Sequence, residues 1–232
     1  MENDLPSLIR SRCYWQAIIR PEQFDEVRVG DYALLFPIVE ESVVTLWSWP
    51  FPIVAGDTDS RRSGEDWVGE EIDWKFGPSL WRLYQSGQFF TLLGMWRDWH
   101  GRSPSNPSGD GPQESLPMWD TIRQFTEIYE FAARLSLTEA GDAAMRVNVK
   151  IGNIQGRILG QDNPRKTSLR YYRFQAPDYS WPAPRSEPIS RDALVGDPRG
   201  LAVEGLAELF KRFDFNAGTQ AIRAWQEELD SP

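Results

Sequence analysis

The sequence predicts an α+β fold, in which a mixed, largely antiparallel sheet is covered by one long amphipathic helix and by C-terminal helices. Three observations support this prediction. Strand-like runs occupy much of the first hundred residues, one strong helical pattern extends from Met118 to Leu135, and two further helical patterns close the chain. A helix with a wide apolar stripe buries that stripe against another element, which we expect to be the sheet.

The N-terminal part contains two predicted strands separated by irregular turns. Residues Tyr14 to Arg20 are rich in β-branched and aromatic side chains and are followed by a proline, which is typical of a strand. Between Asp31 and Val44 the apolar residues have nearly helical spacing, but Pro37 interrupts them, so we expect one or two irregular turns. Val43 to Trp49 predicts the second strand.

Residues 55–66 consist mostly of turn-forming and charged residues and predict a loop. Three predicted strands that are rich in aromatic residues follow it. Trp67 to Trp74, Leu80 to Tyr84 and Phe89 to Trp96 are the predicted strands, and Ser86-Gly87 between the last two is a hairpin signal. Polar and apolar residues alternate only partly here, so we expect at least one of these strands to be covered on both faces.

Residues 101–117 interrupt the pattern with four prolines, three glycines and four serines. Such a composition buries too little apolar surface to stay ordered by itself. We therefore predict a single domain over residues 1–232 with a flexible insertion at about 101–117, which could become ordered when a partner binds.

The strongest helical pattern follows this insertion. From Met118 to Leu135 apolar residues recur at steps of three and four, which predicts a helix with polar residues on its opposite side. Alternating valines and isoleucines around Gly152-Asn153 predict a hairpin of residues 147–151 and 154–159. The remaining predictions are a strand at Leu169 to Phe174, a helix that begins at Asp197-Pro198, and a short last helix with Ile222, Trp225 and Leu229.

Composition excludes several classes of function. The 232 residues include 25 Lys and Arg against 34 Asp and Glu, a net charge of −9. The field of so acidic a chain repels a polyanion, so nonspecific binding to phosphate backbones is not expected. A single cysteine, Cys13, and a single histidine, His100, exclude a disulfide framework, a thiolate metal cage and any site with two imidazoles.

Other absences bear on location and catalysis. No apolar run of about 18 residues is present, and the first ten residues carry acids where a signal peptide has a basic segment. We therefore expect a cytoplasmic protein without a membrane partner. No Gly-rich phosphate loop occurs, His100 lies at the edge of the insertion, and Cys13 is expected in the core. We expect no catalytic residue, no cofactor and no resident metal.

One acidic segment leaves an enzymatic alternative open. Asp73-Trp74-Lys75 is similar to the acidic-x-Lys half of the restriction-type nuclease motif, in which carboxylates hold Mg²⁺ and the lysine orients water. The preceding Pro-Asp element of that motif is absent, and a solvated strand face explains the same residues. A metal-dependent nuclease is therefore the second alternative.

A basic region suggests the first alternative. Between Arg146 and Arg173 there are seven basic residues and one acid, a local charge of +6. Basic residues beside aromatic rings can bind nucleic acid or nucleotides through phosphate contacts and stacking. They can equally contact an acidic partner, and two strands with solvated cationic faces explain the same residues. The candidate residues for this role are Arg157, Lys166, Arg170, Tyr171 and Arg173.

Aromatic residues suggest the main candidate site. The chain has 11 Trp, 12 Phe and 7 Tyr, which together make 13% of its residues. Trp, Tyr and Arg dominate the energetics of interfaces. Two predicted strands are dense in such residues, and we expect Trp47, Trp49, Trp81, Arg82, Tyr84 and Gln88 to form a binding surface.

Four segments together resemble a known module: WQAIIRP from Trp15, WRLYQSGQF from Trp81, EFAARLSLTEAG from Glu130 and RVNVKIGNIQGRIL from Arg146. They are similar to the module that accompanies AlbA-type, Schlafen-like DNA-binding domains in some bacterial proteins, over most of residues 14–215. No AlbA-type domain is visible in the chain, and the resemblance carries no site residues. It implies a sensing or partner-binding role in bacterial defence, including antiviral defence, or in regulation.

The expected function is therefore a non-enzymatic sensor or protein-interaction module, a subunit of a bacterial defence or regulatory complex whose partner is another protein.

Overall fold

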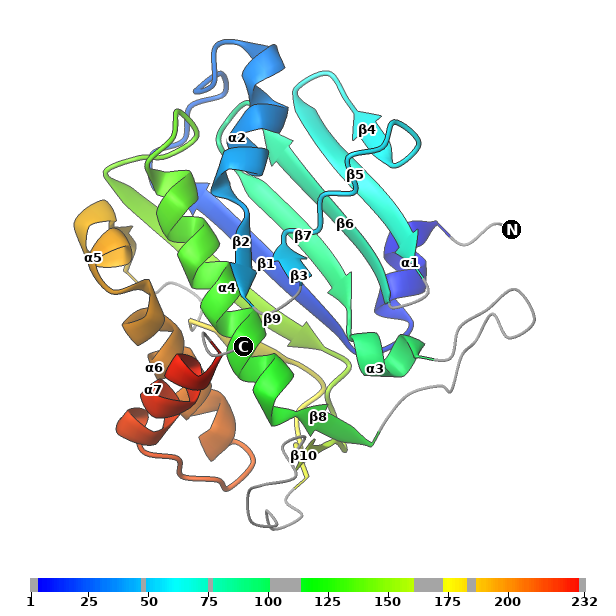
Figure 1. Ribbon diagram of the computed structural model, residues 1–232, viewed down its shortest axis with the longest axis vertical. Coiled ribbons are helices and arrows are strands. Elements are labelled where there is room, and N and C mark those ends of the chain that lie inside the picture. The colour runs from blue at the N-terminus through cyan, green and yellow to red at the C-terminus, as the bar shows by residue number, and fades with distance from the viewer. Residues whose placement is uncertain are drawn as a thin grey trace.

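The computed structural model describes residues 4–46, 49–74, 77–100, 114–160, 173–182 and 187–229. Its elements confirm the predicted α+β class, with helices and a largely antiparallel sheet (Figure 1). In chain order they are α1 (Leu5–Arg10), β1 (Tyr14–Pro21), the 3₁₀ turn η1 (Tyr32–Leu34), α2 (Leu35–Ser42), β2 (Val44–Leu46), β3 (Trp49–Phe51), β4 (Arg61–Ser63), β5 (Trp67–Trp74), β6 (Gly77–Tyr84), β7 (Phe89–Gly94), α3 (Trp96–Trp99), β8 (Ser115–Pro117), α4 (Met118–Ser136), β9 (Ala144–Gly152), β10 (Ile158–Gly160), β11 (Tyr179–Trp181), β12 (Ile189–Ser190), α5 (Arg191–Gly196), α6 (Pro198–Lys211) and α7 (Thr219–Glu228).

An eight-stranded sheet forms the frame, in the order β11-β9-β1-β7-β6-β5-β4, with β12 also paired to β9. Its strand pairs are antiparallel, and β1 lies between β9 and β7, so that Ala17 is opposite both Thr91 of β7 and Val149 of β9. Side chains alternate between the faces of a strand. Trp15, Ala17 and Ile19 therefore share one buried face, the one covered by α4 and α2, and Tyr14 lies on the other, where it packs in a small cluster with Ile9 of α1.

The predicted β6–β7 hairpin is confirmed, with Leu83 paired to Phe89. Its turn requires a glycine, since Gly87 has φ +81° and an added Cβ would lie 2.4 Å from the carbonyl oxygen of Ala140. The predicted start of α6 is also confirmed: Asp197 accepts a hydrogen bond from the Gly200 backbone N–H at 2.8 Å and Pro198 follows it.

The long helix α4 is buried more completely than its pattern predicts. It lies across the sheet, and α6 and α7 pack along its other side (Figure 1). Several residues of its polar side are therefore not solvated: Gln124, Thr126 and Glu127 are all buried. Gln226 of α7 donates to the Thr126 hydroxyl at 2.8 Å, which satisfies one of these polar groups.

Two predictions for residues 31–49 need correction. Pro37 lies in the first turn of α2, where the backbone N–H groups have no partner within the helix, so the N–H that proline lacks is not needed. A regular helix therefore follows η1. The expected strand Val43 to Trp49 is divided: β2 and β3 pair with each other antiparallel, and Pro50 lies inside β3. Residues 47–48 lie outside the described residues.

The hairpin predicted at Gly152-Asn153 is also wrong. β9 pairs with β1, β11 and β12, whereas β10 pairs in parallel with β8. The Asn153 side chain donates to the carbonyl oxygens of Arg10 and Arg12 at 2.6 and 2.9 Å, so this residue anchors the segment after α1 instead of reversing the chain into a hairpin.

Two further predictions fall mainly outside the described residues. Residues 169–172 of the strand expected at Leu169 to Phe174 are not described, although Arg173 forms a bridge with Ile158. Of the insertion expected at about 101–117, residues 101–113 are not described and Ser115–Pro117 forms β8. Among the described helices, none combines the length and the apolar character needed to cross a bilayer.

Candidate functional site

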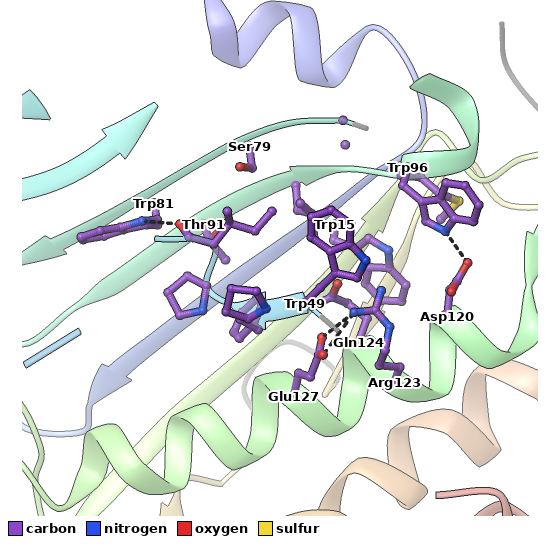
Figure 2. Close-up of a pocket in the computed structure, with 18 of the residues that line it drawn as sticks. Trp15, Trp49, Ser79, Trp81, Thr91, Trp96, Asp120, Arg123, Gln124 and Glu127 are labelled. Atoms are coloured by element: carbon purple, nitrogen blue, oxygen red, sulfur yellow. Dashed lines mark hydrogen bonds and ion pairs between the residues drawn. The ribbon is translucent and has the colours of Figure 1, made fainter. Parts of the chain in front are cut away.

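A pocket of about 320 Å³ lies on the sheet face that carries α4 (Figure 2). The sheet forms one wall through β1, β6 and β7, and α4 forms the opposite wall. The segment from β3 to Ile53 and the start of α3 complete it. Its described lining is Trp15, Trp49, Pro50, Phe51, Pro52, Ile53, Gly77, Ser79, Leu80, Trp81, Thr91, Leu93, Gly94, Met95, Trp96, Pro117, Asp120, Thr121, Arg123, Gln124 and Glu127.

Four tryptophans make the pocket largely aromatic. Trp15 and Trp81 are buried in the sheet face, whereas Trp49 and Trp96 are 40% and 37% exposed. Because Trp49 and Trp96 both line the pocket and reach solvent, they mark its mouth. Large rings with one wet edge are typical of binding sites.

Hydrogen bonds hold two of these rings in place. The Trp81 indole N–H donates to the carbonyl oxygen of Ile53 at 3.0 Å, which fixes the segment after β3 against the sheet. The Trp96 indole N–H donates to Asp120 of α4 at 2.5 Å, which ties α3 to the opposite wall. The aromatic walls are therefore positioned in advance of any ligand.

A buried ion pair lies on the α4 wall. Arg123 Nη1 donates to both Glu127 carboxylate oxygens, at 3.1 and 3.3 Å, and the two side chains are 14% and 1% exposed. Burial raises the pKa of Glu127 to about 7, although the Arg123 guanidinium opposes this shift. Asp120 lies nearer the mouth, and its Oδ2 atom is 3.7 Å from Arg97 Nε.

Two buried polar atoms of the lining have no hydrogen-bond partner among the described residues. They are the Ser79 hydroxyl oxygen on β6 and the Gln124 Nε2 on α4, in side chains that are 5% and 3% exposed. By contrast, the Thr91 and Thr121 hydroxyls donate to the carbonyl oxygens of Leu80 and Pro117, at 2.8 and 2.6 Å. An unmade buried hydrogen bond costs about 1–3 kcal/mol, so such groups need an explanation.

A second buried ion pair positions the end of the pocket that carries Trp96. Arg157 Nη2 donates to Asp98 of α3, and the two side chains are 6% and 0% exposed. Asp98 also accepts from the Cys13 backbone N–H at 3.2 Å, and Arg157 Nη1 donates to the Ser115 carbonyl oxygen at 3.3 Å. This pair joins α3 to β8 and to the start of β1.

The residues of the predicted aromatic surface are divided by the fold. Trp49 and Trp81 line the pocket. Arg82 and Tyr84 alternate with Trp81 along β6 and therefore lie on the opposite face, where Arg82 contacts Glu71 at 3.4 Å and lies 4.3 Å from the Trp67 ring. Gln88 lies in the β6–β7 turn, where its carbonyl oxygen accepts from Tyr84. Trp47 lies outside the described residues.

The residues proposed for nucleic-acid binding have mixed surroundings. Arg157 is buried and paired with Asp98, so a phosphate contact would require this pair to break. Arg173 is exposed and donates to the Gly156 carbonyl oxygen at 2.8 Å. Lys166, Arg170 and Tyr171 lie outside the described residues.

The residues that an enzymatic interpretation would use have different surroundings. Asp73 is exposed on β5, and Lys75 lies outside the described residues. In the part of the chain that the structure describes, no three His, Cys, Asp or Glu side chains are grouped so as to hold a metal ion. His100 is exposed after α3, and Cys13 is buried, which raises the pKa of its thiol to about 12.

The sequence reasoning missed most of the pocket. Trp15, Ser79 and Trp96 gave no separate signal because each lies in a strand-like or aromatic run. On α4 a signal was present: Asp120, Arg123, Gln124 and Glu127 follow helical spacing and form one polar stripe. The sequence predicted polar residues opposite the apolar stripe without singling out these four, which line the pocket.

Comparison with protein-family models, with curated proteins and with solved structures gave no match to this chain.

Proposed function

We propose that the protein is a non-enzymatic sensor, whose pocket between α4 and β6–β7 binds a flat, mostly apolar group. The observation that carries this proposal is the aromatic cavity with two buried polar atoms, Ser79 Oγ and Gln124 Nε2, that have no hydrogen-bond partner among the described residues. An apolar pocket with a few convergent polar groups is the arrangement that small-molecule sites have.

The size of the pocket supports a bicyclic occupant. A cavity of about 150 Å³ accommodates one benzene ring, and this pocket has about 320 Å³. A ring system of two fused rings could enter between Trp49 and Trp96 and pack against Trp15 and Trp81. Offset or edge-to-face contacts between such rings contribute about 0.5–1.5 kcal/mol each beyond the area they bury.

The state of the polar lining favours binding over catalysis. Glu127 is engaged by Arg123, Asp120 accepts from the Trp96 indole, and the Thr91 and Thr121 hydroxyls donate to backbone carbonyl oxygens. These four groups already hold protein partners. The Ser79 hydroxyl has no hydrogen-bond partner among the described residues, so it lacks the adjacent general base that an activated nucleophile needs.

The flat, mostly apolar group that fits the pocket could belong to a free compound or to an aromatic side chain of a protein partner. Membership of a bacterial defence or regulatory complex rests on the sequence resemblance and is part of the proposal. Native mass spectrometry of protein purified gently from its host separates the two sources: a small mass increment indicates a compound, and a second polypeptide indicates a partner.

Binding itself is tested with indane, a bare bicyclic hydrocarbon, in a titration followed by the tryptophan indole resonances in proton–nitrogen NMR. We expect saturable binding at one site. Leu93→Trp, on the pocket wall, should fill the cavity and abolish binding, and Leu137→Trp at a position 63% exposed is the matched control. The proposal is refuted if indane does not bind, or if Leu93→Trp binds it as well as the control does.

A further inference from the structure

The polar atoms of the pocket define what its occupant must carry. Gln124 Nε2 is a hydrogen-bond donor on the α4 wall, and Ser79 Oγ belongs to a hydroxyl on the facing sheet wall (Figure 2). Neither has a partner within the described residues, and both side chains are more than nine-tenths buried. The donor on α4 therefore has no acceptor in the described part of the chain, and an occupant of the pocket can supply one.

Each charged side chain of the described lining already has an ionic partner. Arg123 lies 3.1 Å from Glu127, and Asp120 lies 3.7 Å from Arg97. A charged ligand would lose its hydration on entering this aromatic cavity, and no charge of the lining is left over to compensate it. The occupant should therefore be uncharged.

We infer that the ligand is an uncharged, flat compound of bicyclic size whose ring carries a carbonyl oxygen, and that Gln124 Nε2 donates to this oxygen. This inference rests on the proposed function, because it names the ligand class for the same pocket. Gln124 is the residue that determines specificity, and the tryptophans supply the apolar contact area.

The expected discrimination follows from the unmade hydrogen bond. A ligand without a carbonyl oxygen leaves Gln124 Nε2 unsatisfied in a cavity that its own rings have closed to water. One hydrogen bond of this kind changes the affinity about tenfold, which corresponds to about 1.4 kcal/mol.

The test compares 1-indanone with 1-methyleneindane, which match in shape but differ in the carbonyl oxygen, in the NMR titration used for indane. We expect 1-indanone to bind about tenfold more tightly than 1-methyleneindane to the unchanged protein. In Gln124→Leu, which keeps the volume of the side chain and removes the donor, the two compounds should bind equally. Gln220→Leu, at an exposed glutamine of α7, is the matched control and should keep the tenfold preference.

The outcomes separate this inference from the proposed function. Equal affinity of the two compounds for the unchanged protein, or a preference that survives in Gln124→Leu, overturns the inference and leaves the apolar pocket in place. Tightest binding of indane-1-carboxylate overturns it in favour of an anion held by Arg123. Absence of binding by indane and by both derivatives overturns the proposed function, and the inference with it.

Discussion

The buried pair of Arg157 and Asp98 yields the sharpest test of how the fold supports the pocket. The perturbation is Arg157→Met, which keeps most of the apolar volume and removes the guanidinium. Asp98 is 0% exposed on its side chain, so the change leaves its carboxylate in the interior without the guanidinium of Arg157, while the Cys13 backbone N–H still donates to it.

The magnitude follows from that burial. Removing one member of a buried ion pair costs about 3–5 kcal/mol, because the other charge is left uncompensated. For a chain of 150–250 residues each kcal/mol lowers the melting temperature by about 2–4 °C, so the expected loss is roughly 6–20 °C. Asp98→Asn should have a cost of the same order. The double variant should cost less than the sum of the single variants, since no buried charge remains.

The assay is urea unfolding followed by circular dichroism, with Arg223→Met as the matched control. Arg223 forms the same kind of pair with Asp197, at 2.6 Å, but both side chains are 54% exposed. Exposed pairs contribute about 0–1 kcal/mol. A loss below about 1 kcal/mol for Arg157→Met, or equal losses for the two variants, would refute the reasoning from burial.

Three further predictions concern single groups. Burial raises the pKa of Glu127 from its ordinary value of 4.5 to about 7, so the folded state takes up this proton first as the pH falls. The free energy of unfolding should therefore rise as the pH falls from about 7 towards 4.5, by up to roughly 3 kcal/mol, and Glu127→Gln should flatten this slope in urea titrations at several pH values. Gly87→Ala should cost about 1–3 kcal/mol because of the positive φ and the contact with Ala140, whereas Gly196→Ala, which meets nothing within 4 Å, should cost little; melting temperatures compare the two, and equal values contradict the argument. Cys13, 1% exposed with its thiol pKa raised to about 12, should resist iodoacetamide at neutral pH in the folded protein and react after unfolding; fast labelling of the folded protein would contradict this assignment.

The predictions that succeeded depend on local chemistry. Ser86-Gly87 specified a hairpin because a tight turn needs a residue with positive φ, and Asp197-Pro198 specified a helix start because the cap and the first-turn proline act on neighbouring residues. The amphipathic pattern of Met118 to Leu135 was sufficient to place a helix over nearly its full length. Each of these signals is complete within a few turns of chain.

The predictions that failed depend on which elements meet. The polar stripe of α4 has the spacing of a solvated face, and only the packing of α6, α7 and the pocket around that helix makes it buried. β9 and the segment after it alternate like a hairpin, but Asn153 bonds to carbonyl oxygens 141 and 143 residues away. The pocket itself joins Trp15, Trp49, Trp96 and Gln124, whose spacing in the chain carries no information about their proximity.

Two buried polar atoms of the pocket lack a hydrogen-bond partner among the described residues, and this leads to a stability prediction that distinguishes a binding site from an ordinary core. Ser79 and Thr91 are both hydroxyl residues on neighbouring strands, both 5% exposed, and both in the lining. Thr91 donates to Leu80, so Thr91→Val should destabilise the ligand-free protein by about 0.5–1.5 kcal/mol. Ser79 has no partner among the described residues, so Ser79→Ala should leave stability unchanged or raise it by about 1 kcal/mol.

Urea unfolding of the ligand-free variants measures both effects. A residue kept for binding lowers the stability of the empty protein, whereas a residue kept for the fold raises it. If Ser79→Ala destabilised the protein as much as Thr91→Val does, the Ser79 hydroxyl would serve the fold, and the pocket would lose one of the two groups from which its ligand is inferred. The opposite signs expected here would mean that β6 carries a polar group at the expense of stability, at the place where a ligand would contact it.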